Sequence, residues 1–263
     1  MISLSSDLLQ SWVSGLLWPL TRILAVFAAA PIFSQRVIPQ RVKLGFGLLL
    51  TIIIVPTLPD LPKVEVMSLP GLLIVIQQII IGTAIGFSLR IFFAAVELAG
   101  QLSSLTMGLG FASFFDPASG GQSTSISQFF GMLAILVFLS INGHLLLISA
   151  LLESFHTLPI TADGLTHING MTMAMWASHI FSAGLMMALP IVAALLITNM
   201  ALGILTRTAP QLNLFGIGFP ITIGMGFLII ALSLPSMLRP MQHLIDESFS
   251  FISSIGSQSP VKP

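Results

Sequence analysis

Met107-Gly-Leu-Gly-Phe-Ala-Ser-Phe-Phe-Asp-Pro-Ala-Ser-Gly-Gly121 separates two long hydrophobic segments of this chain, at residues 69–98 and 126–152. Four glycines, three phenylalanines and one Asp-Pro step lie in this stretch, so it cannot form a regular helix. At membrane depth, non-helical backbone is tolerated only where protein buries it or where it lines a cavity. The stretch therefore predicts long membrane-type helices that are interrupted at a pore or a gate.

The composition favours a membrane-associated protein and excludes several other classes. Of the 263 residues, 55% are hydrophobic and 7% are charged, and the mean hydropathy is +1.03. Nine basic and nine acidic residues cancel, so no basic stripe indicates binding of nucleic acid. The absence of cysteine excludes disulfides, thiolate metal sites and catalytic thiols. Because Asp7 precedes the first positive charge, Arg22, we expect no cleaved signal peptide.

Apolar segments bounded by glycine and proline predict an all-α fold in one domain; they lie at residues 8–32, 44–58, 69–98, 126–152, 179–205 and 212–235. The second segment would be roughly 22 Å long as a helix, whereas the hydrocarbon core of a bilayer is about 30 Å thick. It therefore either draws neighbouring lipid inward or packs against protein and never spans alone. Residues 236–255 alternate apolar and polar side chains, which is typical of an amphipathic helix at an interface.

Polar residues form a stripe near the end of the third segment. Arg90 and Glu97 are seven residues apart and share one helical face, which Gln101 and Ser104 extend. Ionised groups in apolar segments usually face a cavity or a partner. Two interpretations stay open: an interfacial helix end whose charges reach water, or a polar face that lines a water-filled route or meets another subunit.

Small residues recur at the spacing that lets helices approach closely. Gly82 and Gly86 form a GxxxG pair, and Ala25 and Ala29 form a weaker version of it. Such pairs predict close helix packing, either within this chain or between subunits.

Motifs for catalysis are missing or incomplete. Residues 107–113 begin like a GxGxxG dinucleotide fingerprint, but Ser113 occupies the third glycine position and no strand precedes it. Asp116 has no second acid in a comparable setting, so a paired-carboxylate mechanism lacks its partner. His144, after Asn142-Gly143, is either a proton relay or a residue that, with Asn142, hydrogen-bonds locally in a helix kink. We therefore expect no enzyme activity, no cofactor and no metal.

The chemistry of residues 107–121 suits obstruction of a channel. Bulky, deformable apolar side chains can seal a constriction by excluding water; they are Met107, Phe111, Phe114 and Phe115. Four glycines permit tight turns and movement: Gly108, Gly110, Gly120 and Gly121. The alternatives are a buried loop that merely fills space and a loop that docks a partner.

Five stretches together resemble one known family. They are Pro39-Gln-Arg-Val-Lys-Leu-Gly45, the run at 107–117, Asn142-Gly-His144, Phe155-His-Thr-Leu-Pro159 and Ala209-Pro-Gln-Leu-Asn-Leu-Phe-Gly-Ile-Gly-Phe-Pro220. In this order and over nearly the whole chain they look like the FliR family, the R subunit of the flagellar type III export gate, called SctT in injectisomes. The Asn-Gly-His and Ala-Pro-Gln-Leu versions favour the flagellar branch.

The resemblance implies a subunit of a hetero-oligomer rather than a protein that acts alone. It would assemble with P and Q export-gate subunits and the FlhB-type switch protein into the channel for unfolded flagellar proteins. A P-like helical part at about 1–175 would precede a Q-like helical hairpin and a C-terminal amphipathic helix at about 176–255. The complex would lie in the bacterial inner membrane and flagellar basal body, with its core above the bilayer plane.

The resemblance also implies roles for individual residues. The channel plug would be Met107, Gly108, Leu109, Gly110, Phe111, Ala112, Ser113, Phe114, Phe115, Asp116 and Pro117, with Gly120 and Gly121 as its hinge. Arg207, Pro210 and Gln211 would lie at the cytoplasmic tip of the hairpin.

The rival function is a stand-alone transporter or channel for small solutes. That rival needs several ionisable groups at mid-helix depth, where only Arg22 and His144 qualify.

Overall fold

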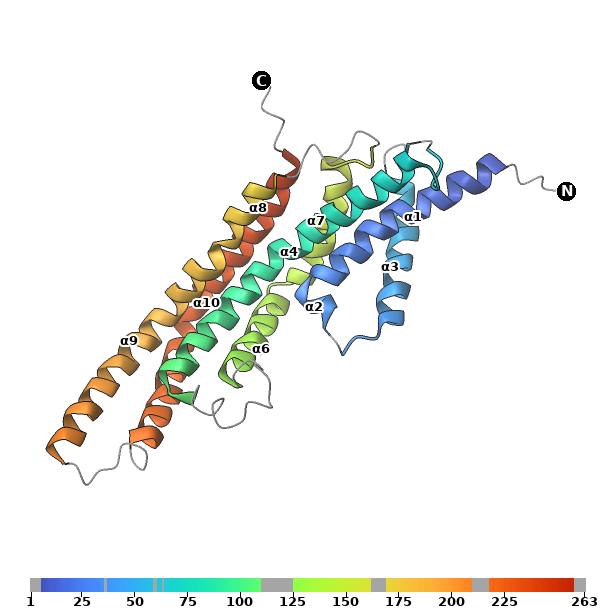
Figure 1. Cartoon of the computed structure of the whole chain (residues 1–263). Coiled ribbons are helices and arrows are strands. Elements are labelled where there is room, and N and C mark those ends of the chain that lie inside the picture. The colour runs from blue at the N-terminus through green and yellow to red at the C-terminus, as the bar shows by residue number, and fades with distance from the viewer. Residues whose placement is uncertain are drawn as a thin grey trace, which may run out of the picture. The chain divides into compact units, whose positions relative to one another are not determined.

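The computed structural model of the chain describes residues 6–35, 37–58, 61–62, 64–109, 125–161, 169–209 and 218–257, with the backbone alone at 6–13 and 256–257. Within these residues the regular elements are all helical, which confirms the predicted all-α fold (Figure 1). The elements are α1 (Ser6–Ala29), α2 (Pro31–Ser34), α3 (Gln40–Ile54), η1 (Val55–Thr57), α4 (Leu69–Thr106), α6 (Ser125–Ser140), α7 (Gly143–Thr157), α8 (Gly170–Ala177), α9 (His179–Thr208) and α10 (Phe219–Ser257).

Four stretches of helix are long and apolar enough to cross a membrane: Gln40–Thr57, Leu69–Thr106, Gly170–Thr208 and Phe219–Ile255. The pair α6 and α7 makes a fifth candidate if it is taken as one broken span. The first predicted segment yields a shorter apolar helix over Ser14–Ala29 among the described side chains. The described helices therefore supply four or five candidate spans, where the sequence pattern predicts six apolar segments.

Helix α10 is longer than the sequence pattern indicates. One helix of 39 residues, Phe219–Ser257, runs from the predicted apolar segment at 212–235 into the predicted amphipathic stretch at 236–255 without a break. Pro235 and Pro240 lie inside it. Proline removes one backbone donor and clashes with one carbonyl, but it does not force the chain to turn away. Buried side chains continue at helical spacing between and beyond the two prolines, at Met237, Met241 and Leu244, so packing holds the helix together.

The chain divides into two compact units that are interleaved along the sequence. The first contains Met1–Arg90, Asn142–Ala177 and Asp246–Pro263, and the second contains Ile91–Ile141 and Ser178–Ile245. The predicted division into a P-like part at 1–175 and a Q-like part at 176–255 stays a prediction.

Small residues set the packing of α1 on α4 in the first unit. A Cβ atom added at Gly82 would lie 2.5 Å from the Arg22 carbonyl oxygen and 2.7 Å from Ala25 Cβ. At Gly86, the added atom would lie 2.5 Å from Ala29 Cβ. Such distances are too short for any real Cβ, so only glycine fits at either position. Of the two interpretations of these motifs, packing within the chain is therefore the one observed.

The second unit uses the same device to pack α6 and α9 on the end of α4. A Cβ atom at Gly100 would lie 2.8 Å from Ser127 Cα on α6, and one at Gly184 of α9 would lie 2.9 Å from the Ala95 carbonyl oxygen. The Phe93 and Phe138 rings add an aromatic contact between α4 and α6, with centroids 5.7 Å apart. Van der Waals packing of close backbones thus holds this unit together.

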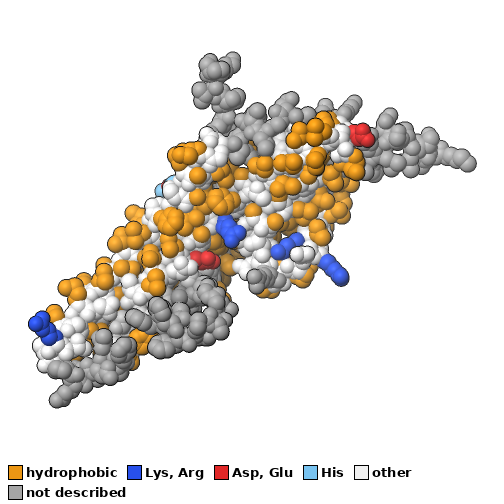
Figure 2. Space-filling view, viewed as in Figure 1, with side chains coloured by type: hydrophobic (Ala, Val, Ile, Leu, Met, Phe, Trp, Pro, Cys, Tyr) orange, Lys and Arg blue, Asp and Glu red, His pale blue; other side chains and the backbone are white. Residues whose placement is uncertain are grey.

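Much of the described surface is apolar, and Figure 2 shows hydrophobic side chains spread over the described elements with few charges between them. The buried residues of α3 are Gly47, Thr51 and Ile54. Its large apolar side chains are exposed instead: Val42, Leu44, Phe46, Leu48, Leu49, Ile52 and Ile53. Helix α3 therefore offers most of its apolar surface to something other than the described part of its own chain.

Candidate functional site

The predicted plug begins where α4 ends. The Met107 amide donates to the Ser103 carbonyl at 3.0 Å and the Gly108 amide to the Leu105 carbonyl at 3.1 Å, which closes the last turn. Gly108 has a φ of 82°, a left-handed conformation that stops helices and that glycine adopts without steric cost. Met107, Gly108 and Leu109 are described; the remaining predicted plug and hinge residues, at 110–117, 120 and 121, lie outside the described residues.

Met107 is fully buried, with 0% of its surface exposed. Its side chain fills the space that Gly226 leaves on α10. A Cβ atom at Gly226 would lie 2.6 Å from both Cγ and Cε of Met107 and 2.7 Å from its sulfur. The missing side chain at Gly226 therefore makes room for Met107 inside the second unit.

Polar contacts join the same helix ends. The Asn199 side-chain amide on α9 donates to the Thr106 carbonyl at 3.3 Å. The Thr222 hydroxyl on α10 donates to the Gly218 carbonyl at 2.8 Å and lies 3.4 Å from the Asn199 oxygen Oδ1. The last turn of α4 is thus linked to α9 by a hydrogen bond and to α10 by the buried Met107 contact.

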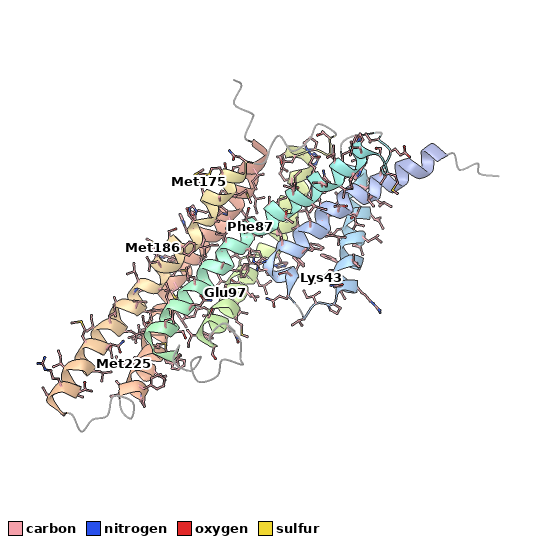
Figure 3. All side chains as sticks on the ribbon, in the orientation of Figure 1. Lys43, Phe87, Glu97, Met175, Met186 and Met225 are labelled. Carbon is pink, nitrogen blue, oxygen red and sulfur yellow. The ribbon has the colours of Figure 1, made fainter. Side chains whose placement is uncertain are left out.

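The residues of the predicted polar stripe do not share one environment. Arg90, Glu97 and Gln101 are exposed on α4, and Glu97 is labelled in Figure 3. Glu97 lies along α6, because a Cβ atom at Gly131 would be 3.3 Å from its Oε1. Ser104, which extends the same helical face, is fully buried. Helical spacing sets the direction of a side chain, whereas the neighbours that pack there decide its exposure.

Arg22 is a buried cation that the sequence pattern singled out only as an ionisable group within an apolar segment. Its Nε donates to Gln78 Oε1, one Nη donates to the Ser154 carbonyl and the other to the Leu158 carbonyl, each at 2.7 Å. The side chain has 0% exposure. Its partners lie 56 to 136 residues away, so no local motif could predict them. The first unit holds this guanidinium in a closed polar cluster rather than at a solute site.

The break between α6 and α7 lies at the predicted kink. Asn142 has a φ of 57° and a ψ of 30°, and its carbonyl accepts from the Leu145 amide at 2.9 Å. Asparagine tolerates this left-handed conformation better than most residues. The predicted local hydrogen bond of His144 does not form at Nδ1, which is buried with no partner in the described part of the chain.

Arg207 is exposed in the last turn of α9, which ends at Thr208. A cation is favourable there because the helix C-terminus carries a partial negative charge. Pro210 and Gln211, the other residues of the predicted hairpin tip, lie outside the described residues.

These features define a class of protein: an all-helical, membrane-type subunit with long apolar helices. Residues 13–248 match the family described as Bacterial export proteins, family 1. The chain is 43% identical to Flagellar biosynthetic protein FliR of Pectobacterium carotovorum subsp. carotovorum over 258 residues, which cover 98% of each chain. It is also 43% identical to FliR of Escherichia coli (strain K12) over 261 residues, 99% of this chain and all of the relative. The FliR of Bacillus subtilis (strain 168) is 32% identical over 213 residues, 80% of this chain and 82% of the relative. The chain therefore belongs to the FliR family of flagellar export proteins.

Proposed function

We propose that this chain is a subunit of the flagellar type III export gate and forms, with P and Q subunits, the channel for unfolded flagellar proteins. The observation that carries the proposal is the match to FliR proteins over almost the entire chain. A non-enzymatic role follows, in which partners supply the energy. The location would be the bacterial inner membrane within the flagellar basal body, next to the FlhB-type switch protein.

The exposed apolar helices support a role in an assembly. On α9, large apolar side chains are exposed along most of the helix: Phe181, Leu185, Met186, Leu189, Leu196, Ile197, Met200 and Ile204. Met186, labelled on α9 in Figure 3, is 70% exposed. Apolar surfaces of this extent mark contacts with protein or lipid. Partner subunits that cover α3 and α9 would account for these surfaces.

The environment of Arg22 argues against the rival function of a stand-alone transporter. Ionisable groups that carry a solute or a proton face a cavity or a water-filled route. Arg22 instead is fully buried and donates to neutral acceptors of its own unit. The stand-alone transporter depended on two mid-helix ionisable groups, Arg22 and His144. Arg22 is therefore a structural residue of the first unit and does not serve that function.

Within the gate, we assign the plug to residues 107–117 and its hinge to Gly120 and Gly121; the plug segment is defined as 107–121. The fixed position of Met107 and the left-handed turn at Gly108 support a firm attachment at its start. Arg90, Glu97 and Gln101 would form a polar contact with another subunit, since their exposed side chains interrupt an apolar surface. Arg207, Pro210 and Gln211 would lie at the cytoplasmic tip of the hairpin.

Purification of the tagged chain from cells that express all gate subunits tests the assembly. We expect it to co-purify with P and Q subunits in a hetero-oligomer. A functional monomer or a symmetric homo-oligomer would contradict the proposal and favour the stand-alone transporter.

Deletion of residues 110–115 tests the plug in the assembled complex. We expect the closed complex to leak ions or small molecules, because the apolar seal is removed. Unchanged conductance in a normally assembled complex would contradict the seal. For the hinge, Gly120→Val with Gly121→Val should reduce secretion while assembly stays normal, and undiminished secretion would contradict it.

A further inference from the structure

We propose that one face of α3 docks an apolar helix of a neighbouring gate subunit, and that this helix carries a carboxylate opposite Arg41. The inference rests on the proposed function, because it gives the chemistry of a partner within the same assembly. We call this surface the Gly45 face. Its residues lie three or four positions apart and therefore on one side of α3: Arg41, Val42, Gly45, Leu48, Leu49 and Ile52.

The first support is that α3 buries only a narrow stripe against its own unit. The buried residues are Gly47, Thr51 and Ile54. A Cβ atom at Gly47 would lie 2.9 Å from Leu24 Cδ2 on α1, so this side of α3 is closely packed. The large side chains of the Gly45 face are 47% to 57% exposed: Val42, Leu48, Leu49 and Ile52. A partner can therefore reach the Gly45 face without displacing any described part of the first unit.

Aromatic stacking holds the start of α3 in place. The Phe46 ring of α3 lies 5.6 Å from the Phe27 ring of α1, between centroids, and the ring planes are 11° apart. Phe27 also stacks on Phe33 of α2, with centroids 4.5 Å apart. Stacked aromatic rings add to the burial of three helices. The orientation of the Gly45 face is thus fixed before a partner binds, which lowers the entropic cost of docking.

The second support is Gly45 itself. A Cβ atom there meets nothing within 4 Å, whereas the glycines at 82 and 86 of α4 lie against α1. Glycine in a helix interior destabilises the helix relative to alanine, and no described contact of this chain offsets that loss at Gly45. Its missing side chain leaves a notch beside Val42 and Leu49, into which a partner backbone fits closely. Flexible lipid chains cover leucine as well as glycine, so the notch favours a rigid helix over lipid.

The third support is the charge at the start of the face. Arg41 is exposed, and no acidic side chain among the described residues pairs with it. It lies in the first turn of α3, a helix without acidic residues. A helix N-terminus carries a partial positive charge, so a cation there is unfavourable without an anion. Lys43, labelled in Figure 3, lies off the face and donates to the Gln35 carbonyl at 3.3 Å. A carboxylate on the partner helix would complement Arg41 and set the register of docking.

Gly45→Leu tests the notch in cells that express all gate subunits. We expect it to lower several-fold the amount of P and Q subunits that co-purify with the tagged chain, because leucine fills the notch. Gly45→Ala should lower that amount less. The control is denaturant unfolding of the isolated Gly45→Leu chain, whose free energy of unfolding should not fall, since the added side chain meets no described neighbour. A wild-type amount of P and Q subunits with Gly45→Leu would overturn the docking face and leave α3 to lipid.

Arg41→Gln and Lys43→Gln form a matched pair for the charge. Each removes one positive charge near the start of α3, but only Arg41 lies on the Gly45 face. We expect Arg41→Gln to reduce the co-purified P and Q subunits several-fold and Lys43→Gln to leave them at the wild-type amount. Equal amounts with the two variants would overturn the carboxylate on the partner.

A photoreactive phenylalanine analogue in place of Leu49 reads the contact with Gly45 and Arg41 unchanged. In the assembled complex we expect it to form a covalent adduct with a P or a Q subunit on irradiation. An intact complex without such an adduct would overturn the docking face and leave the proposed function standing. If the wild-type chain co-purifies with neither P nor Q subunits, the proposed function fails instead, so the two failures are distinguishable.

Discussion

The guanidinium carbon of Arg22 lies 4.3 Å from the centroid of the Phe155 ring. The same guanidinium donates to the carbonyls of Ser154 and Leu158, at the end of α7. The last carbonyls of a helix lack partners within it and carry its negative dipole end. Arg22 therefore caps α7 from another helix, and the aromatic face adds a cation–π contact. This explains how the first unit buries a cation whose hydrogen bonds go to neutral acceptors.

Replacement of Arg22 should destabilise the first unit strongly. Arg22→Met removes the donors to Gln78 Oε1 and to the Ser154 and Leu158 carbonyls, and each buried acceptor left without a donor costs roughly 1–3 kcal/mol. Arg22→Lys keeps the charge but loses the planar fork, so we expect an intermediate loss. The midpoint of thermal unfolding, measured on the purified Arg22→Met and Arg22→Lys variants in detergent, gives the loss of stability in each. The control is Arg239→Met, at an exposed position of α10; an equal shift for Arg22 and Arg239 would contradict the capping role.

Gly82 should tolerate no side chain. Gly82→Leu would push a Cβ atom into the Arg22 carbonyl oxygen, 2.5 Å away, and should cost about 1–3 kcal/mol as overpacking. Gly45→Leu on α3 is the matched control, since nothing lies within 4 Å of its Cβ position. It should be neutral or stabilising, because glycine in a helix interior costs roughly 0.5–1 kcal/mol. Denaturant unfolding compares the free energies of unfolding of Gly82→Leu and Gly45→Leu. A similar loss of free energy in both variants would show that the packing of α1 on α4 does not depend on this close approach.

Asn142 should be replaceable by glycine but not by a β-branched residue. Its φ of 57° is left-handed, a conformation that glycine and asparagine adopt readily and that costs most other residues roughly 1–2 kcal/mol. We therefore expect Asn142→Gly to retain the wild-type free energy of unfolding. Asn142→Val should lower it by at least about 1–2 kcal/mol. Ser140→Val, at an exposed position in the last turn of α6, controls for added apolar surface. Equal stability of the Gly and Val variants at 142 would contradict a left-handed backbone there.

The helical content of the chain could be predicted from its sequence because long apolar runs bounded by glycine and proline favour helices in a membrane-type chain. The small-residue motif at Gly82 and Gly86 also predicted close helix packing correctly, because two glycines four residues apart lie on one helix face and let another backbone approach it. Their partner, α1, lies about sixty positions away, so the pattern left packing within the chain and between subunits equally open. Only the contacts with Ala25 and Ala29 decide between these alternatives.

Other features depended on tertiary contacts that no local pattern contains. Ser104 has the spacing of an exposed residue and yet is buried. Pro235 reads as a helix end, but packing on both sides of it continues α10. Gly226 had no motif to mark it, although its missing side chain accommodates Met107. A glycine inside a long apolar helix was the one sequence feature that could indicate this contact. It is not specific, because several other glycines in apolar helices, such as Gly224, have no neighbour within 4 Å of their Cβ position.

Trp176 should be essential to the first unit through its ring rather than its polar atom. It stacks on Phe251 of α10 with centroids 4.8 Å apart and ring planes 8° apart. Its Nε1 donates to the Ser88 carbonyl on α4 at 3.4 Å, a long and therefore weak bond. Stacking and burial thus outweigh the hydrogen bond in the contribution of this side chain.

Truncation of Trp176 to alanine should therefore cost about 3–5 kcal/mol, as for large buried aromatic residues. Trp176→Phe keeps a stacked ring and should recover most of that loss. Met171→Ala, at a 66% exposed position of the same helix, is the control and should change the unfolding free energy little. The midpoint of thermal unfolding in detergent ranks the three variants. If Trp176→Phe were as unstable as Trp176→Ala, the bond to Ser88 and not the stack on Phe251 would hold α8 in place.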